Sequence, residues 1–195
     1  KRSVIASGSR LYDATTTVSS SDLSTITGTV GDETLTLTGS GTLSNANAGS
    51  NKSITLGSIA LANGSNGGVV GNYSLSSGTL TVNRRPLAAT LARQYDGTTT
   101  AAGSSLSSFN ALQGGQTLAL TGSGTIASKN VGSGKSVTLG SIALADGTGS
   151  AANYSLSSAA MNVSQRPVIL SGSRQYDASN TAKASDLNNI SGTVG

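Results

Sequence analysis

The sequence predicts an all-β protein, built as a tandem array of small antiparallel β-sandwich domains of the Ig-like type. Three observations predict this fold class. The 195-residue chain repeats itself, apolar and polar residues alternate within each repeat, and glycine-containing turns interrupt the alternating runs at short intervals. Alternation with a period of two is typical of strands that have one face in a core and one face in water. Sandwich domains combine many such short strands with tight turns.

The repeat is clearest in the run Arg-x-Tyr-Asp, which occurs three times. The motif residues are Arg10, Tyr12 and Asp13, then Arg93, Tyr95 and Asp96, and finally Arg174, Tyr176 and Asp177. A period of about 80 residues is too long for a solenoid coil and is typical of one small globular domain. We therefore expect repeat 1 at residues 3–85, repeat 2 at 86–166 and a partial repeat 3 at 167–195, in a chain that is an excerpt of a longer array.

The joints between repeats are expected at Pro86 and Pro167, because proline fixes φ and blocks the continuation of a strand. The repeat alone does not fix where the folded domain begins, since a fold that starts elsewhere in the cycle has the same period. Residues 62–71 and 145–152 are expected to form a surface loop. The second copy is shorter there, and connections tolerate a change of length better than packed strands do.

The expected strands follow the alternating runs in chain order. These runs lie at residues 34–38, 53–56 and 79–82, with matching runs at 117–120 and 137–139 in the second copy. Threonine and valine favour extended backbone, and about six or seven strands are expected in each repeat. The segment 21–26 and its matches at 104–109 and 185–190 instead place apolar residues three apart after a serine. This spacing predicts a single helical turn, so a β-grasp-like repeat with one short helix is the alternative architecture.

Composition excludes most enzyme chemistry. Charged residues make up 10% of the chain and aromatic residues 3%, and the chain contains no cysteine or histidine. Its one glutamate, Glu33, is replaced by Gln116 in the second copy, so neither a nucleophile–base pair nor a carboxylate pair repeats. The aspartates lack the alternate spacing of a calcium loop. We expect no enzyme activity, no catalytic residue, no cofactor and no metal.

The net charge of +4 would ordinarily indicate an anionic partner. The basic residues are spread thinly, however, and no aromatic residues are interleaved with them, so we expect no nucleic-acid binding. No apolar run approaches the roughly 20 residues of a membrane helix, and this segment is not expected to insert into a membrane. The ordered spacing of the apolar residues favours folded domains over a low-complexity linker.

The repeated polar residues are interpreted as structural. A tyrosine buries its ring and needs a partner for its hydroxyl, an aspartate caps a turn through its own backbone, and the arginine of the motif is expected to pair with that aspartate or to cover the ring. Tyr73 and Tyr154, which follow the variable loop, are expected to tie a strand start in the manner of a tyrosine corner. Lys52 and Lys135 are candidates for the amine of a Lys-Asn amide bond, although no partner for that bond is visible in the sequence.

Several segments of the second copy form a pattern in order: Tyr-Asp-Gly-Thr-Thr-Thr at 95–100, Thr-Leu-Ala-Leu-Thr-Gly-Ser-Gly-Thr at 117–125, Ser-Lys-Asn-Val-Gly-Ser-Gly-Lys-Ser-Val at 128–137 and Asn-Tyr-Ser-Leu at 153–156. This pattern resembles the YDG repeats, and the related MBG repeats, of large bacterial surface adhesins of the filamentous-haemagglutinin type. The resemblance covers both full repeats. Repeat 1 departs from it, with Asp-Ala at 13–14 and Asn-Ala-Asn-Ala at 45–48.

The resemblance implies exported, cell-surface, β-rich stalk modules of proteins whose adhesive tips lie elsewhere, and it supplies no catalytic residue. We therefore expect a structural spacer at the bacterial surface or in an extracellular matrix, with neighbouring repeats of the same chain as its partners and homotypic chain association, as in a biofilm, as a variant. The alternative is a module that binds a glycan or another surface directly, through the hydroxyl row of Thr34, Thr36 and Thr38.

Overall fold

The computed structural model describes residues 1–194, and it confirms an all-β fold. The described residues form strands and 3-10 turns of three residues, with no α-helix among them. The chain divides into two compact units. The first unit consists of residues 1–87 together with 111–118 and 144–155, and the second consists of residues 88–110, 119–143 and 156 onward.

Repeat 1 contains eight strands, rather than the six or seven expected. They are β1 Arg2–Leu11, β2 Thr17–Ser19, β3 Thr25–Thr27, β4 Leu35–Thr38, β5 Ser40–Leu43, β6 Gly49–Thr55, β7 Ala60–Asn63 and β8 Tyr73–Asn83, with 3-10 turns η1 Ser20–Asp22 and η2 Val70–Asn72. Six strands form one sheet in the order β2-β5-β6-β8-β1-β3, and β4 pairs with β7. The additional strands are runs of only three or four residues, too short for alternation to reveal them.

Repeat 2 copies this arrangement strand for strand. Its elements are β9 Arg85–Gln94, β10 Thr100–Ala102, β11 Leu106–Phe109, β12 Leu118–Thr121, β13 Ser123–Ile126, β14 Gly132–Thr138, β15 Ala143–Asp146 and β16 Tyr154–Ser164, with η3 Gly103–Ser105 and η4 Ala151–Asn153. The sheet order is β10-β13-β14-β16-β9-β11, with β12 beside β15. The partial third repeat contributes β17 Ile169–Ser171, η5 Ala184–Asp186 and β18 Asn189–Ser191. The two large sheets curl into half-barrels, and the Ig-like sandwich stays a prediction.

Two local expectations are refined by the structure. The helical turn expected at 21–26 is the 3-10 turn η1, whose capping residue is Ser19 rather than Ser21, and the rest of that segment forms β3. Asp22 completes the cap by accepting the backbone N–H of Ser19 at 2.9 Å. The difference in loop length falls between β7 and η2 in repeat 1 and between β15 and η4 in repeat 2, as the sequence predicted.

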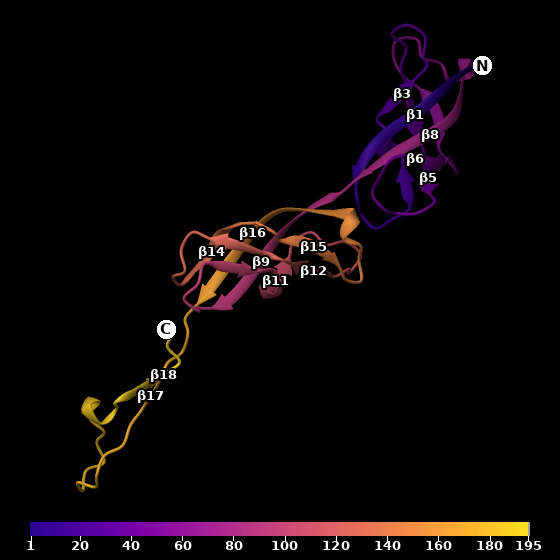
Figure 1. The fold of residues 1–195 in the computed structure, drawn as a ribbon. Coiled ribbons are helices and arrows are strands. Elements are labelled where there is room, and N and C mark those ends of the chain that lie inside the picture. The colour runs from indigo at the N-terminus through magenta and orange to yellow at the C-terminus, as the bar shows by residue number, and fades with distance from the viewer. Residues whose placement is uncertain (195) are drawn as a thin grey trace. The chain divides into compact units, whose positions relative to one another are not determined.

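The first and last strands of repeat 1 pair in parallel, so the expectation of a purely antiparallel domain was wrong for this pair. Strand β1 (indigo) lies beside β8 (magenta) along the full length of both, with Arg2 opposite Tyr73 and Leu11 opposite Asn83 (Figure 1). A parallel pair places the start of one strand beside the start of the other. The chain therefore enters and leaves repeat 1 at opposite ends of this pair, about 33 Å apart for ten residues.

The joint between β8 and β9 is a single residue, Arg84. Pro86 is the second residue of β9 rather than the end of a strand, and it is accommodated there because the first residues of a strand can lack a ladder N–H. In repeat 1, the core includes Val4, Leu35 and Tyr73, so the β4–β7 pair covers the strands β1 and β8. Burial alternates along β8 and β9, as the period of two requires.

Candidate functional site

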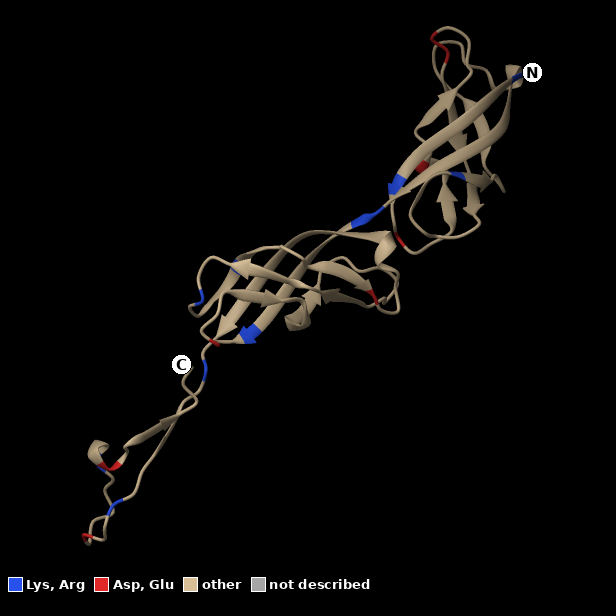
Figure 2. Cartoon of the chain, in the orientation of Figure 1, with Lys and Arg blue, Asp and Glu red and all other residues tan. Residues whose placement is uncertain are grey.

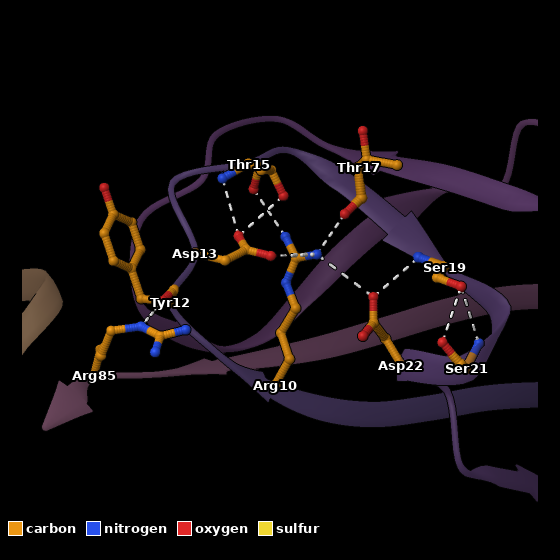
Figure 3. Close-up of polar contacts among 9 residues, drawn as sticks. All are labelled: Arg10, Tyr12, Asp13, Thr15, Thr17, Ser19, Ser21, Asp22 and Arg85. Carbon is orange, nitrogen blue, oxygen red and sulfur yellow. Dashed lines mark hydrogen bonds and ion pairs between the residues drawn. The ribbon is translucent and has the colours of Figure 1, made fainter. Parts of the chain in front are cut away.

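The arginine and aspartate of the first motif close the turn between β1 and β2. The Arg10 guanidinium donates to the carbonyl of Thr15 at 2.8 Å and to that of Thr17, and its Nη1 lies 3.3 Å from Asp13 and 3.4 Å from Asp22 (Figure 3). Asp13 Oδ1 accepts both the N–H and the hydroxyl of Thr15 at 2.9 Å. These are the contacts of an Asx-turn whose carboxylate is held by an arginine.

The other two motifs contain the same pairing. Arg93 pairs with Asp96, whose Oδ1 accepts the N–H and the hydroxyl of Thr98, both at 2.9 Å. Arg174 Nη1 lies 3.2 Å from Asp177. Because every carboxylate of the motif is occupied by its own turn and its own arginine, the arrangement is suited to holding the turn rather than to binding a substrate.

The tyrosines of the three motifs have very different surroundings. Tyr12 is 3% exposed, Tyr95 is half-buried, and Tyr176 is 94% exposed. Backbone position does not explain why Tyr12 and Tyr95 differ in exposure. The backbone N–H of each tyrosine donates to a carbonyl in the last strand of its own repeat, at 2.9 Å in both cases. The difference therefore comes from side chains outside the motif.

Tyr12 is buried by two residues that are distant in sequence and belong to the same compact unit, Gln116 and Tyr154. The Tyr12 and Tyr154 rings meet edge to face, with centroids 5.2 Å apart and planes at 77°. Gln116 Nε2 donates to the Tyr12 hydroxyl at 2.8 Å, and the Tyr154 hydroxyl donates to Gln116 Oε1 at 2.8 Å. Glutamine can link two hydroxyls in this way because its amide is both donor and acceptor.

A second contact in the same unit involves Asn153, the residue before Tyr154. Asn153 is 4% exposed. Its Nδ2 donates to Asn47 Oδ1 at 3.1 Å, and its Oδ1 accepts the backbone N–H of Ala48 at 2.9 Å. We call the six residues Tyr12, Asn47, Ala48, Gln116, Asn153 and Tyr154 the repeat junction. Each of its buried polar side chains has a partner, as a desolvated polar contact requires.

Lys52 holds the loop that carries Asn47 and Ala48. Its ammonium donates to the carbonyl and to Oδ1 of Asn45 at 2.8 and 2.9 Å, and also to the carbonyl of Asn47. Burial, and then the charge of Arg10, lower the pKa of Lys52 below its usual value.

In repeat 2, Lys135 donates to the carbonyl of Ser128 at 2.9 Å, so a serine stands where repeat 1 has Asn45. The Lys-Asn amide bond stays a prediction, and intact mass tests it through the loss of ammonia.

Tyr73 and Tyr154 each tie the start of a strand to the loop before β4 or β12. Tyr73 donates to the Glu33 carboxylate and accepts the N–H of Val30 at 3.1 Å, while Tyr154 accepts the N–H of Gln113 at 3.2 Å. The hydrogen bond to Glu33 is the largest influence on the Tyr73 hydroxyl, and it raises the pKa of Tyr73.

One known domain family matches most of the chain. The YDG domain family matches residues 2–81 and again residues 78–163. The chain belongs to the YDG domain family. No curated protein and no solved structure matches the chain. Repeats 1 and 2 are therefore two YDG domains, and the tyrosine of the Arg-x-Tyr-Asp motif in the first YDG domain lies in the repeat junction.

Sequence reasoning selected Tyr12 and Tyr154 but missed the other residues of the repeat junction. Two signals were present in the YDG pattern. Gln116 stands at the position of Glu33, and Asn153 precedes its tyrosine just as Asn72 does in repeat 1. Neither signal says that Gln116 meets Tyr12 or that Asn153 meets Asn47 and Ala48, because contacts between distant segments have no local pattern.

Charged residues are sparse in both YDG domains. Acidic and basic residues are few and scattered over the chain, and most of it is neutral (Figure 2). Within residues 1–194, no group of three His, Cys, Asp or Glu side chains is close enough to hold a metal. No helix in that range is long and apolar enough to cross a bilayer.

Proposed function

We propose that this chain is a structural spacer, a segment of the stalk of an exported bacterial adhesin or of an extracellular matrix fibre. In this role the YDG domains project or link adhesive domains at the cell surface. The observation that supports the proposal most is the repeat junction, in which Tyr12 is buried against Gln116 and Tyr154. A buried, hydrogen-bonded aromatic contact at the end of a repeat resists bending more than a flexible linker does.

Two further features support a spacer. The parallel pairing of β1 and β8 sends the chain out of a repeat at the end opposite its entry, so each added repeat adds length. Only Arg84 connects β8 to β9, which leaves little slack between consecutive strands. The low charge also leaves neutral surface for packing between chains, and we include homotypic association in a matrix as a variant of the proposal.

The hydroxyl row that favoured direct glycan binding is engaged within the repeat. Thr36 donates to the carbonyl of Asn63 at 3.1 Å, and the Thr34 hydroxyl lies 2.8 Å from that of Ser65. Thr38 lies 3.5 Å from the carbonyl of Ala60. Hydroxyls that hold the β4–β7 pair together are less available to a sugar, so these contacts favour the spacer over the glycan-binding module.

Small-angle X-ray scattering on proteins of two, four and six repeats tests the proposal. The maximum dimension should grow linearly with repeat number, by about 30 Å for each added domain. Alanine at the position of Tyr12 in every junction is the matched variant, and it should shorten the mean dimension while each domain stays folded. Scaling with the square root of repeat number in the unmodified proteins would contradict a spacer of this kind.

A further inference from the structure

The two strands through which the chain enters and leaves repeat 1 are paired directly with each other (Figure 1). Strand β1 lies beside β8 in parallel over ten paired positions, from Arg2 opposite Tyr73 to Leu11 opposite Asn83. We call β1 and β8 the terminal strand pair. Because the pairing is parallel, the start of β1 and the end of β8 lie at opposite ends of the pair. A pull on the chain from both sides of repeat 1 therefore acts on these two strands in opposite directions.

The direction of such a pull determines how many hydrogen bonds must break together. When two paired strands are pulled along their length from opposite ends, the load is shared by all the bonds between them. When the same strands are pulled apart from one end, the bonds break one after another. A single hydrogen bond contributes little net stability in water, so resistance to force depends on how many bonds are loaded at once.

Both strands of the terminal strand pair lie in the interior of their sheet. Strand β8 also pairs with β6, and β1 also pairs with β3. The side chains that face the core are buried, namely Val4 and Ala6 of β1 and Leu80 and Val82 of β8. Hydrogen bonds that water reaches poorly are electrostatically stronger than exposed ones. Sliding one strand past the other would also break the flanking pairs and expose these core residues.

Additional hydrogen bonds support the pair at its one irregular position and at its far end. The register shifts by one residue after Val4, and the unopposed residue of β8 is Ser76, whose hydroxyl donates to the carbonyl of Val4 at 3.0 Å. Beyond β1, the N–H of Tyr12 donates to the carbonyl of Asn83 at 2.9 Å. The carbonyl of Tyr12 accepts Arg85 Nε at 2.7 Å. The contacts of the pair thus continue into the repeat junction.

Repeat 2 places its own first and last strands next to each other. Strand β9 lies beside β16 in its sheet. The N–H of Tyr95 donates to the carbonyl of Ser164 at 2.9 Å, as that of Tyr12 does to Asn83 in repeat 1. Only Arg84 separates β8 from β9. Tension that leaves repeat 1 through β8 is therefore passed along the chain directly into β9.

We propose that the terminal strand pair is a mechanical clamp, which makes repeat 1 resist unfolding when the chain is pulled lengthwise. The resistance comes from the direction of the load and from the number of bonds loaded together, rather than from high thermodynamic stability. Unfolding under force is governed by the unfolding rate, which differs between pulling directions in one and the same folded protein. The use of this clamp in a stalk under tension rests on the proposed spacer role, whereas the clamp itself is a property of repeat 1.

Pulling the full chain from two different pairs of attachment points tests the clamp. The chain contains no cysteine, so two introduced cysteines define where DNA handles are coupled. The opposite-end protein carries Lys1→Cys and Arg84→Cys, which load the terminal strand pair from its two ends. The same-end protein carries Lys1→Cys and Asn72→Cys, which pull the two strands apart from one end. All three residues are exposed and lie outside β1 and β8.

Optical tweezers measure the unfolding force of both proteins at one loading rate. The opposite-end protein should unfold at a force at least about twofold higher, because ten paired positions are loaded together instead of one after another. Unfolding should release about 250 Å of chain in either protein, which identifies the event as the unfolding of repeat 1. Equal melting temperatures of the two proteins are the control for thermodynamic stability.

Equal unfolding forces, or a higher force for the same-end protein, would overturn the clamp. The spacer has a separate readout, the scaling of length with repeat number in X-ray scattering. Linear scaling together with equal unfolding forces would retain the spacer and remove the clamp. Square-root scaling together with a higher force for the opposite-end protein would retain the clamp and contradict the spacer.

Discussion

The two YDG domains have the same strand order and the same motif turn, but they differ at their ends. Asn72 of repeat 1 is exposed, whereas Asn153, at the same position in repeat 2, is buried and bonded to Asn47 and Ala48. Tyr12 is 3% exposed, and Tyr95 is only half-buried. Residues at matching positions of the repeat therefore differ in burial, and the neighbouring segment decides which of them belong to a junction.

The largest expected difference in stability is between alanine variants of Tyr12 and of Tyr176, the tyrosine of the third motif. Tyr12→Ala removes the ring that packs on Tyr154 and the hydroxyl that Gln116 binds, and it should lower the free energy of unfolding by about 3–5 kcal/mol. Tyr176→Ala, at a 94% exposed position, should change it by about 0.5 kcal/mol or less. Urea denaturation of the full chain measures both, and similar losses in the two variants would contradict the junction.

A smaller difference in stability is expected between alanine variants of Asn153 and Asn72, which occupy the same position in the two repeats. Asn153→Ala leaves Asn47 Oδ1 and the N–H of Ala48 without their partner, which should cost about 1–3 kcal/mol. Asn72→Ala should cost about 0.5 kcal/mol or less, because the side chain is exposed. Thermal melting followed by circular dichroism compares them. A larger loss for Asn72→Ala would mean that the asparagine serves its own repeat rather than the junction.

The motif aspartates should behave alike, in contrast to the motif tyrosines. Asp13→Ala and Asp96→Ala each remove two bonds from the following threonine and one arginine pair, and each should cost about 1 kcal/mol. The measurement is the shift in the urea midpoint of each variant. Strongly unequal shifts would show that this turn also depends on its neighbours.

The smallest expected effect is on how the stability of repeat 1 changes with pH under alkaline conditions. The hydrogen bond to Glu33 raises the pKa of Tyr73 in the folded state, so this interaction contributes stability below the unfolded value of about 10 and loses it as pH rises through the folded value. Glu33→Gln, which gives repeat 1 the residue of repeat 2, should make stability fall less steeply above pH 10. Melting temperatures from pH 8 to 11 test this, with Tyr73→Phe as the variant that lacks the titrating group. An unchanged slope in both variants would contradict the assigned cause.

The local part of the fold was largely readable from the sequence. Alternation at 34–38, 53–56 and 79–82 placed strands that the structure contains in β4, β6 and β8. The short strands β2 and β3 were not predicted, because three residues are too few to show a period. The parallel pairing of β1 with β8 was not predicted either. The two strands are about 70 residues apart in the sequence, and side-chain alternation is the same in parallel and antiparallel strands.

By itself, the sequence determined the repeat, the all-β class and the turn held by Arg10 and Asp13, because these depend on spacing and on contacts between residues close in the chain. Only the tertiary structure decided that Tyr12 meets Gln116 and Tyr154, and that Asn153 is buried while Asn72 is not. Such contacts join segments more than 100 residues apart. They arise when folding brings the end of one repeat against another segment, and no periodicity within a repeat encodes that meeting.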